Sequence, residues 1–424
     1  MNRVLLTRFM AAGFALATVV VAVPAGAGPL PPTIDTSFAT DGSTKLTGFG
    51  HVKWWALQAT DTNYYVTGNT ALDGRDLGIV ARYNLDGTLD STFSGDGVVT
   101  LAPKSTEGRS RPIVTSVAVQ SAGAVMLAAR DTLTGDVLVV RLKADGARDT
   151  SFGTHGVQFF HQGKAGFFPS TAVDTDDRVS ITYSRYLVSS KQSEIVVRRF
   201  DPDGVADPTW GPTSNGVAVT HVGPGTEVWN AATDSQGRVL VGGYIYRHRT
   251  FKSFVVRVDA GGADPTFGAD GVVYATLADR STEMGGVMVD AQDRVLAALG
   301  SGQRLGVARW TVDGTPDPTY GGDGVSAVRG SFGASSVYWG VLTPDGVVLA
   351  SHAWKDPAGI VLTRFEKHGG LDPFFGVDGE GAINIYSKHD TAYMTALDAT
   401  GRLVIAANQD QSEGPGFLTR VLLS

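Results

Sequence analysis

The chain of 424 residues contains no cysteine. This absence excludes disulfide bonds, thiolate metal sites, cysteine nucleophiles and a lipid-bearing N-terminal cysteine. Basic residues are also short in number, 35 against 42 acidic residues, which leaves a formal net charge of −7. A polyanion is repelled on average by such a chain, so we expect no nucleic acid partner. We expect no cofactor, and we assign no residue as a metal ligand.

Only one long apolar run is present, and it lies at the N-terminus. Arg3 and Arg8 precede the run from Phe9 to Val23, and "AGA" follows at 25–27. The run is shorter than the roughly 20 residues that cross a bilayer, whereas its charges and small residues are typical of a secretory signal peptide. We predict that residues 1–27 are this signal, cleaved after Ala27. The remaining residues, 28–424, are then one secreted domain without a transmembrane anchor.

A sustained helical period is absent from the rest of the chain, and a repeat takes its place. An arginine is followed seven or eight residues later by aspartate, and an aromatic residue follows the aspartate by three. Successive aspartates are 53 to 59 residues apart. The repeated pairs are Arg82 and Asp90, Arg141 and Asp149, Arg199 and Asp207, Arg257 and Asp264, Arg309 and Asp317, and Arg364 and Asp372, with Asp35 and Arg420 left at the two ends.

Each period holds four short runs of β character bounded by glycine and aspartate. Seven such units predict an all-β, seven-bladed β-propeller with four antiparallel strands per blade. The repeats begin with the last part of a unit and end with the first part of one, so we expect the ring to close by pairing the two ends of the chain. We predict that a strand near 43–47 is the outer strand of the last blade, whose inner strands come from 394–423, and that Arg420 pairs with Asp35. We expect a monomer.

The repeat resembles a known family. The stretch "RLKADGARDTSFGTHG" at 141–156, together with "DSQGRVLVGG" at 234–243, is similar to the delta-60 repeat of exported bacterial proteins. This resemblance covers nearly the whole chain after residue 27 and implies a β-propeller, but no common activity. Ala39 and Ser94 stand where the pattern has glycine, "WGPTSNG" carries an insertion, and "VDAGGAD" is shortened.

The repeated residues have a structural interpretation. Asp-Gly pairs suit tight turns, the aromatic residue suits the apolar wedge between radial sheets, and equal numbers of arginine and aspartate predict an ion pair in every blade. The alternative, calcium-binding loops, is disfavoured because each turn offers only two acidic groups.

Loops that differ between repeats are the candidates for a specific function. We expect the strand that follows the repeated aromatic residue to be the outermost strand of each blade. The loops that repeat then share one face of the propeller, and the loops that differ share the other. Aromatic, basic and histidine side chains gather in the dissimilar loops, a mixture suited to a sugar or peptide ligand. The candidate ligand-binding residues are His51, Trp54, His161, His221, Trp229, Tyr246, Arg249, Tyr338, Trp339, His352, Trp354 and His389.

Three function classes follow. The first is a binding or scaffold module for an extracellular glycan or protein; the second is a polysaccharide lyase or glycoside hydrolase at the same face. A third is a metal held by histidines from several blades. The patterns G-x-S-x-G and H-E-x-x-H are missing, so no serine hydrolase or zinc protease of those kinds is expected. Candidate groups are His221, His352, Tyr338 and Arg249 for a lyase, and Glu107, Glu227, Glu283 and Asp356 for a hydrolase.

Overall fold

The computed structural model describes most of the chain from residue 31 onward, and there it is built of strands and turns alone. The described residues are 31–423 without 103–109, 161–163, 167, 188–189, 191, 278–280, 303, 331–335, 354–358, 384, 387–389 and 410–414. The predicted signal peptide lies outside them, as do Glu107, His161, Trp354, Asp356 and His389.

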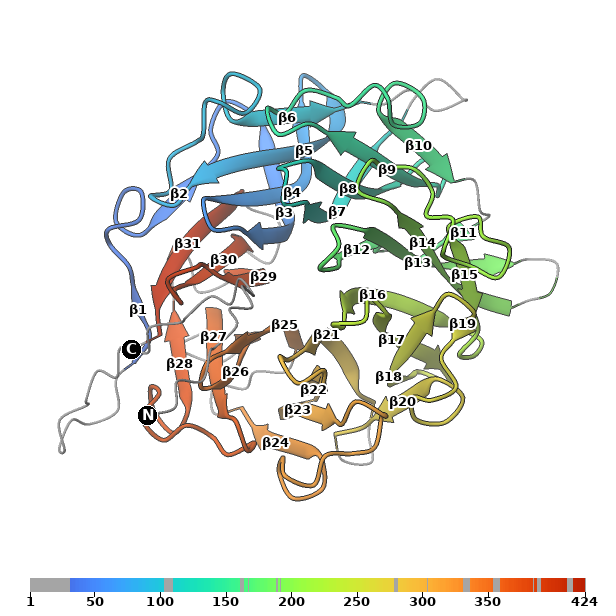
Figure 1. The fold of residues 1–424 in the computed structure, drawn as a ribbon. Helices are drawn as coiled ribbons and strands as arrows, with labels where there is room; N and C mark the ends of the chain where they lie inside the picture. The colour runs from blue at the N-terminus through green and yellow to red at the C-terminus, as the bar shows by residue number, and fades with distance from the viewer. Residues whose placement is uncertain are drawn as a thin grey trace, which may run out of the picture.

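Seven antiparallel sheets stand around a central axis like the blades of a propeller (Figure 1). This confirms the predicted fold class. Blade 1 contains β3 (His51–Ala59), β4 (Asn63–Leu72), β5 (Arg75–Asn84) and β6 (Val98–Leu101). Blade 2 contains β7 (Pro112–Val119), β8 (Val125–Asp131), β9 (Val137–Leu142) and β10 (Val157–Phe160). Blade 3 contains β11 (Lys164–Ala165), β12 (Ser170–Val173), β13 (Val179–Leu187), β14 (Gln192–Phe200) and β15 (Val217–Thr220). Blade 4 contains β16 (Thr226–Thr233), β17 (Val239–Arg247), β18 (Thr250–Asp259), β19 (Gly262–Ala263) and β20 (Val272–Ala275). Blade 5 contains β21 (Glu283–Val289), β22 (Val295–Ser301), β23 (Arg304–Trp310) and β24 (Val325–Arg329). Blade 6 contains β25 (Ser336–Thr343), β26 (Gly346–Ala353), β27 (Gly359–Glu366) and β28 (Glu380–Ile383).

Blade 7 joins the two ends of the chain, as predicted. It contains β29 (Thr391–Leu397), β30 (Leu403–Asn408), β31 (Gly416–Leu422) and the N-terminal strands β1 (Thr33–Ile34) and β2 (Ser43–Lys45). Both N-terminal strands pair with β31, with Ser43 opposite Thr419. The Nε atom of Arg420 lies 2.7 Å from Oδ2 of Asp35, which confirms the predicted ion pair across the closure.

The repeated arginine joins each blade to the next. In blade 5, Nε of Arg309 lies 2.8 Å from Asp317, Nη2 donates to Thr319, and the guanidinium lies 4.5 Å from the ring centroid of Tyr320. Its Nη1 donates to the carbonyl of Lys367 in blade 6 at 2.6 Å. The predicted ion pair is present in every blade, through Arg82 and Asp90, Arg141 and Asp149, Arg199 and Asp207, Arg257 and Asp264, and Arg364 and Asp372 as well.

The aromatic residue of each repeat fills the wedge between two blades. Phe93 is fully buried and packs in one cluster with Tyr65 and Val80 of blade 1 and Leu127 of blade 2. A β-carbon on Gly146, in the next blade's Asp-Gly turn, would approach this ring to 3.0 Å. The turn of one blade therefore closes directly over the aromatic side chain of its neighbour.

The departures from the repeat keep the turn geometry. Ala39 and Ser94 adopt φ values of 50° and 58°, close to the 54° of Gly153 at the equivalent position. In blade 4, where the turn is shortened, Arg199 of blade 3 donates to the carbonyl of Gly237 instead, at 3.1 Å. The scaffold thus absorbs these changes locally.

Strand order divides the loops between two faces. In each antiparallel blade the first-to-second hairpin and the long third-to-fourth link lie at one end, which we call the repeat face. The second-to-third hairpins and the links into the next blade lie at the other end, the variable face. The predicted separation of repeated and dissimilar loops is therefore correct.

The closing ion pair gives a first prediction. Asp35→Asn leaves Arg420, 2% exposed, without its counter-charge, and we expect the free energy of unfolding to fall by about 3–5 kcal/mol. We also expect faster hydrogen exchange in β1 and β2, because only noncovalent contacts hold these strands in blade 7. Urea unfolding and exchange mass spectrometry measure the two effects. Asp317→Asn is the matched control, since it breaks the same pair in a continuous blade; equal protection of β1 and β2 in both variants would contradict the prediction.

Acid should weaken the same pairs. Burial raises the pKa of each paired carboxyl, but hydrogen bonds from the residue two positions on and from the arginine outweigh it, so the pKa lies below its usual value in Asp35, Asp90, Asp207, Asp264 and Asp317. A lowered folded-state pKa contributes stability that is complete above the unfolded value of about 4 and is lost as the pH falls through the folded value. We expect the urea midpoint to fall steeply below about pH 4. A midpoint that stays constant there would rule this out.

The strained turns give a third prediction. Ser94→Gly should raise the free energy of unfolding by about 0.5–1 kcal/mol, because glycine adopts positive φ without a β-carbon clash. Ser91→Gly, three residues earlier at an ordinary φ, should lower it through the greater entropy of the unfolded chain. Thermal and urea unfolding compare the two variants, and destabilisation by both would show that Ser94 is not strained.

Candidate functional site

The first strands of six blades carry a β-bulge near the variable face. The register between the first and second strands shifts at Trp55, Thr115, Trp229, Gly285, Tyr338 and Tyr393. These strands form the innermost ring of the molecule (Figure 1). A bulge breaks the alternation of side chains along a strand and turns one residue to a new direction. In blade 3 the corresponding position is Pro169, directly before β12, and the aromatic side chain of this blade is that of the preceding residue, Phe168.

Five aromatic side chains from the inner strands meet at this level, around the central axis. Trp229 contacts Phe168 with ring centroids 4.8 Å apart, and Phe168 contacts Trp55 at 5.9 Å. Trp55 contacts Tyr393 at 5.0 Å, and Tyr393 contacts Tyr338 at 5.4 Å. Blades 1 and 3 are not neighbours, so the contact between Trp55 and Phe168 joins two blades that blade 2 separates in the ring. All five side chains are half-buried; we call them the mouth cluster.

Hydrogen bonds fix the two tryptophans of the cluster. Nε1 of Trp55 donates to Oδ1 of Asn69 at 2.7 Å, and Nε1 of Trp229 donates to the carbonyl of Gly285 in the next blade at 3.2 Å. Because the indole nitrogens are already satisfied by the protein, what the rings offer to solvent is apolar surface. The cluster is a preformed aromatic platform.

Carboxylates and phenols surround the platform. Glu227 accepts a hydrogen bond from Ser184 at 3.0 Å, and loss of solvation raises the pKa of Glu283, although that side chain keeps contact with solvent. Burial, with Tyr393 and Glu283 nearby, raises the pKa of Tyr338 to about 12. Burial, with Glu227 and Glu283 nearby, raises the pKa of Tyr244 to about 12. The mouth therefore combines neutral hydroxyl donors with carboxylate acceptors.

Of the predicted ligand-binding residues, Trp229 and Tyr338 belong to the mouth cluster. Trp339 is half-buried against blade 5, close to Gly286. His51 and His221 are exposed on the variable face, with His221 3.7 Å from Glu194. Tyr246 and Arg249 are exposed on the hairpin between β17 and β18.

Two other predicted residues lie in the interior. Trp54 is 0% exposed and packs between blades 1 and 7, where its backbone nitrogen donates to Asn408. His352 is 1% exposed, with Nδ1 3.2 Å from the carbonyl oxygen of Asp390. A ligand at the surface does not reach either ring, so both side chains act in packing.

The candidate residues named from the sequence do not include Trp55, Phe168, Tyr393 or Tyr244. All four lie in or beside the loops that differ between repeats, but a loop's variability does not show which of its side chains meet those of other blades. The usable signal is positional: 55, 229, 338 and 393 are equivalent positions of the repeat and are all aromatic, and Phe168 comes one residue before the equivalent position in blade 3.

Among the described residues, no three His, Asp or Glu side chains are grouped so that they could hold a metal ion. A membrane-spanning helix is likewise not found in the part of the chain that the structure describes. The turn aspartates that suggested a calcium loop are engaged by arginine side chains and backbone amides, as Asp317 shows through Arg309 and the amide of Thr319.

Comparison with known proteins supports the architecture. Residues 63–93 and 127–152 match the model of DUF5122, a β-propeller domain of unknown function. No protein in a curated collection matches the chain. A streptogramin B lyase structure is similar with a TM-score of 0.51 at 8% identity, over 90% of this chain and 97% of the lyase. Virginiamycin B lyase from Staphylococcus aureus gives 0.50 at 11% identity, over 90% and 98%. Such low identity shows the fold alone, and the match to the model places these repeats in a β-propeller repeat family.

Proposed function

We propose that this chain is a secreted binding module of the delta-60 repeat kind, which recognises a glycan at the mouth cluster, on the side of its variable face. One observation carries the proposal: five half-buried aromatic side chains from five blades meet in one cluster on the inner strands, near the variable face. The N-terminal segment, with its basic start and apolar run, supports export.

The chemistry of the mouth suits a sugar. Ring faces of Trp55 and Trp229 supply flat apolar surface for the C–H face of a pyranose. The hydroxyl of Tyr338 is protonated at neutral pH, as in an ordinary tyrosine, and its raised pKa extends this to more alkaline pH, so it can donate to a ring or hydroxyl oxygen. Glu227 and Glu283 can accept from sugar hydroxyls, which fixes orientation.

A second candidate, a glycoside hydrolase, draws on the raised pKa of Glu283. A carboxyl that holds its proton to higher pH serves as a general acid beside an ionised partner, and Glu227 is the second carboxylate of the mouth. The polysaccharide lyase is less favoured than the sequence alone suggests, because His352, one of its candidate catalytic groups, is buried.

A glycan array with residues 28–424 tests the proposal, with the mass of each bound glycan measured afterwards. We expect binding with unchanged mass, and we expect Trp55→Ala and Trp229→Ala each to weaken it about tenfold or more. A shortened product would instead support the hydrolase.

Phe374→Ala is the control, because this side chain is 62% exposed on the repeat face. It should bind like the unaltered protein, and circular dichroism should show that all three variants are folded. Binding that survives both tryptophan substitutions, or no binding on the array, would contradict the proposal.

A further inference from the structure

The hairpin between β17 and β18 differs in charge from the rest of the molecule. Arg247, Arg249 and Lys252 are exposed here together with His248, and no carboxylate occurs from residue 244 to residue 254. The chain as a whole carries a net charge of −7. The described residues include no ion pair to any of these four side chains. The hairpin therefore presents a local cationic surface on an acidic protein.

The turn of this hairpin is strained. His248 and Arg249 adopt φ values of 52° and 65°, the left-handed region at both central positions. A two-residue turn of this kind favours Asn-Gly, and each bulkier side chain costs about 1–2 kcal/mol. Strain of this size is typical of positions where a side chain serves a purpose other than folding.

Aromatic stacking stiffens the strands that carry the turn. The Phe251 ring lies 4.9 Å from Tyr244 and 4.8 Å from Tyr246, measured between centroids. Tyr246 remains 49% exposed. Aromatic faces therefore alternate with cationic groups along the hairpin, which is held in one shape before any ligand arrives.

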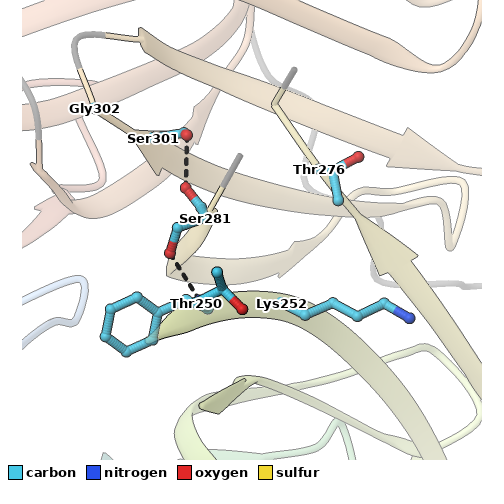
Figure 2. Close-up of a pocket in the computed structure, with 7 residues that line it drawn as sticks. Thr250, Lys252, Thr276, Ser281, Ser301 and Gly302 are labelled. Atoms are coloured by element: carbon cyan, nitrogen blue, oxygen red, sulfur yellow. Dashed lines mark hydrogen bonds between the residues drawn. The ribbon is translucent and has the colours of Figure 1, made fainter. Parts of the chain in front are cut away.

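A pocket opens at the base of the hairpin, between blades 4 and 5 (Figure 2). Its volume is about 670 Å³, and hydroxyl side chains of Thr250, Thr276, Ser281 and Ser301 line it. Ser301 donates to the carbonyl of Ser281, whose hydroxyl accepts from the amide of Phe251. The Lys252 ammonium lies 3.5 Å from the ring centroid of Tyr274, a contact that holds the cation at the rim.

We propose that the hairpin from Tyr246 to Lys252 and this pocket form a binding site for an anionic polysaccharide that carries carboxylate or sulfate groups. The guanidinium groups of Arg247 and Arg249 bind the acidic groups, Tyr246 covers a sugar face, and the hydroxyl-lined pocket receives a neighbouring unit. Its volume lies within the 300–1,000 Å³ that is usual for small-ligand sites. The site is separate from the mouth cluster and does not depend on the function proposed there.

An anionic glycan fits better than nucleic acid. The basic residues form one short hairpin and not an extended track, so a long polyanion would pass from them onto an acidic surface. A polysaccharide with spaced charges needs only local cations together with hydroxyl and aromatic contacts, which are what the hairpin and the pocket offer.

The double variant His248→Asn/Arg249→Gly tests the proposal without damaging the fold. Asn-Gly is the preferred sequence for this turn, so the variant should unfold at a higher temperature than the unaltered protein. The probes are oligogalacturonate, chondroitin sulfate, neutral dextran and single-stranded DNA of similar length, measured by calorimetry at low and high salt. We expect binding to one or both anionic glycans, about tenfold or more weaker in the variant and weaker at high salt.

Lys252→Met is the second variant and should weaken binding as well. Arg75→Gln is the matched control, because Arg75 is an exposed arginine of the corresponding hairpin in blade 1. Unchanged affinity in the double variant, an equal loss in Arg75→Gln, or equal binding to dextran would overturn the proposal. Equal or tighter binding to DNA would overturn the choice of a glycan. Loss of mouth binding in Trp229→Ala alone leaves this site standing, so the two proposals fail separately.

Discussion

The structure depends on the bonding of one guanidinium group in each blade. A buried arginine is stable only when its charge and its donors are all satisfied, and here the partners come from two blades. Arg309 pairs with a carboxylate and contacts an aromatic ring of blade 5, and it donates to a carbonyl of blade 6. Arg420 joins blades 7 and 1 in the same way, because it pairs with Asp35 and donates to the carbonyl of Leu85. No blade can complete its own core alone. Seven copies of this dependence make the ring cooperative, and the split blade closes by the same chemistry as the continuous ones.

This constraint reserves the repeat face for the scaffold. The long links carry the aspartates and aromatic rings, and the first-to-second hairpins hold further carboxylates such as Asp234, which is bonded to Arg238 and to backbone amides. These carboxylates are therefore engaged by the scaffold. The repeated ion pairs and aromatic wedges do not involve the loops of the variable face, so its hairpins and links can differ between blades. The bulges and the mouth cluster lie near this face, and the basic hairpin lies on it.

The fold could be predicted from the sequence because the closing interaction repeats. Seven arginines, seven aspartates and a nearly constant interval predict the blades, the strand order and even the pairing of Arg420 with Asp35. The site could be predicted only to the level of segments. Trp54 and Trp55 are adjacent, and regular alternation does not tell which one contacts aromatic side chains of other blades. The bulge at Trp55 decides it, and nothing in the local sequence marks a bulge. His352 has the composition of a surface loop around it, yet its ring lies inside the blade.

Blade 4 links the two chemistries of the variable face. Its first strand supplies Trp229 and Glu227 to the mouth cluster and its surroundings. Glu227 is opposite Tyr244 in the strand register, and Tyr244 contacts Phe251 of the basic hairpin edge to face. Carboxylates therefore lie toward the axis and cations toward the rim along one continuous sheet. A glycan with uniform negative charge would be attracted at the rim and repelled at the mouth. A chain that occupies both places must present neutral sugar to the aromatic platform and acidic groups to the hairpin, so the charge pattern of blade 4 fixes the direction in which such a ligand can lie.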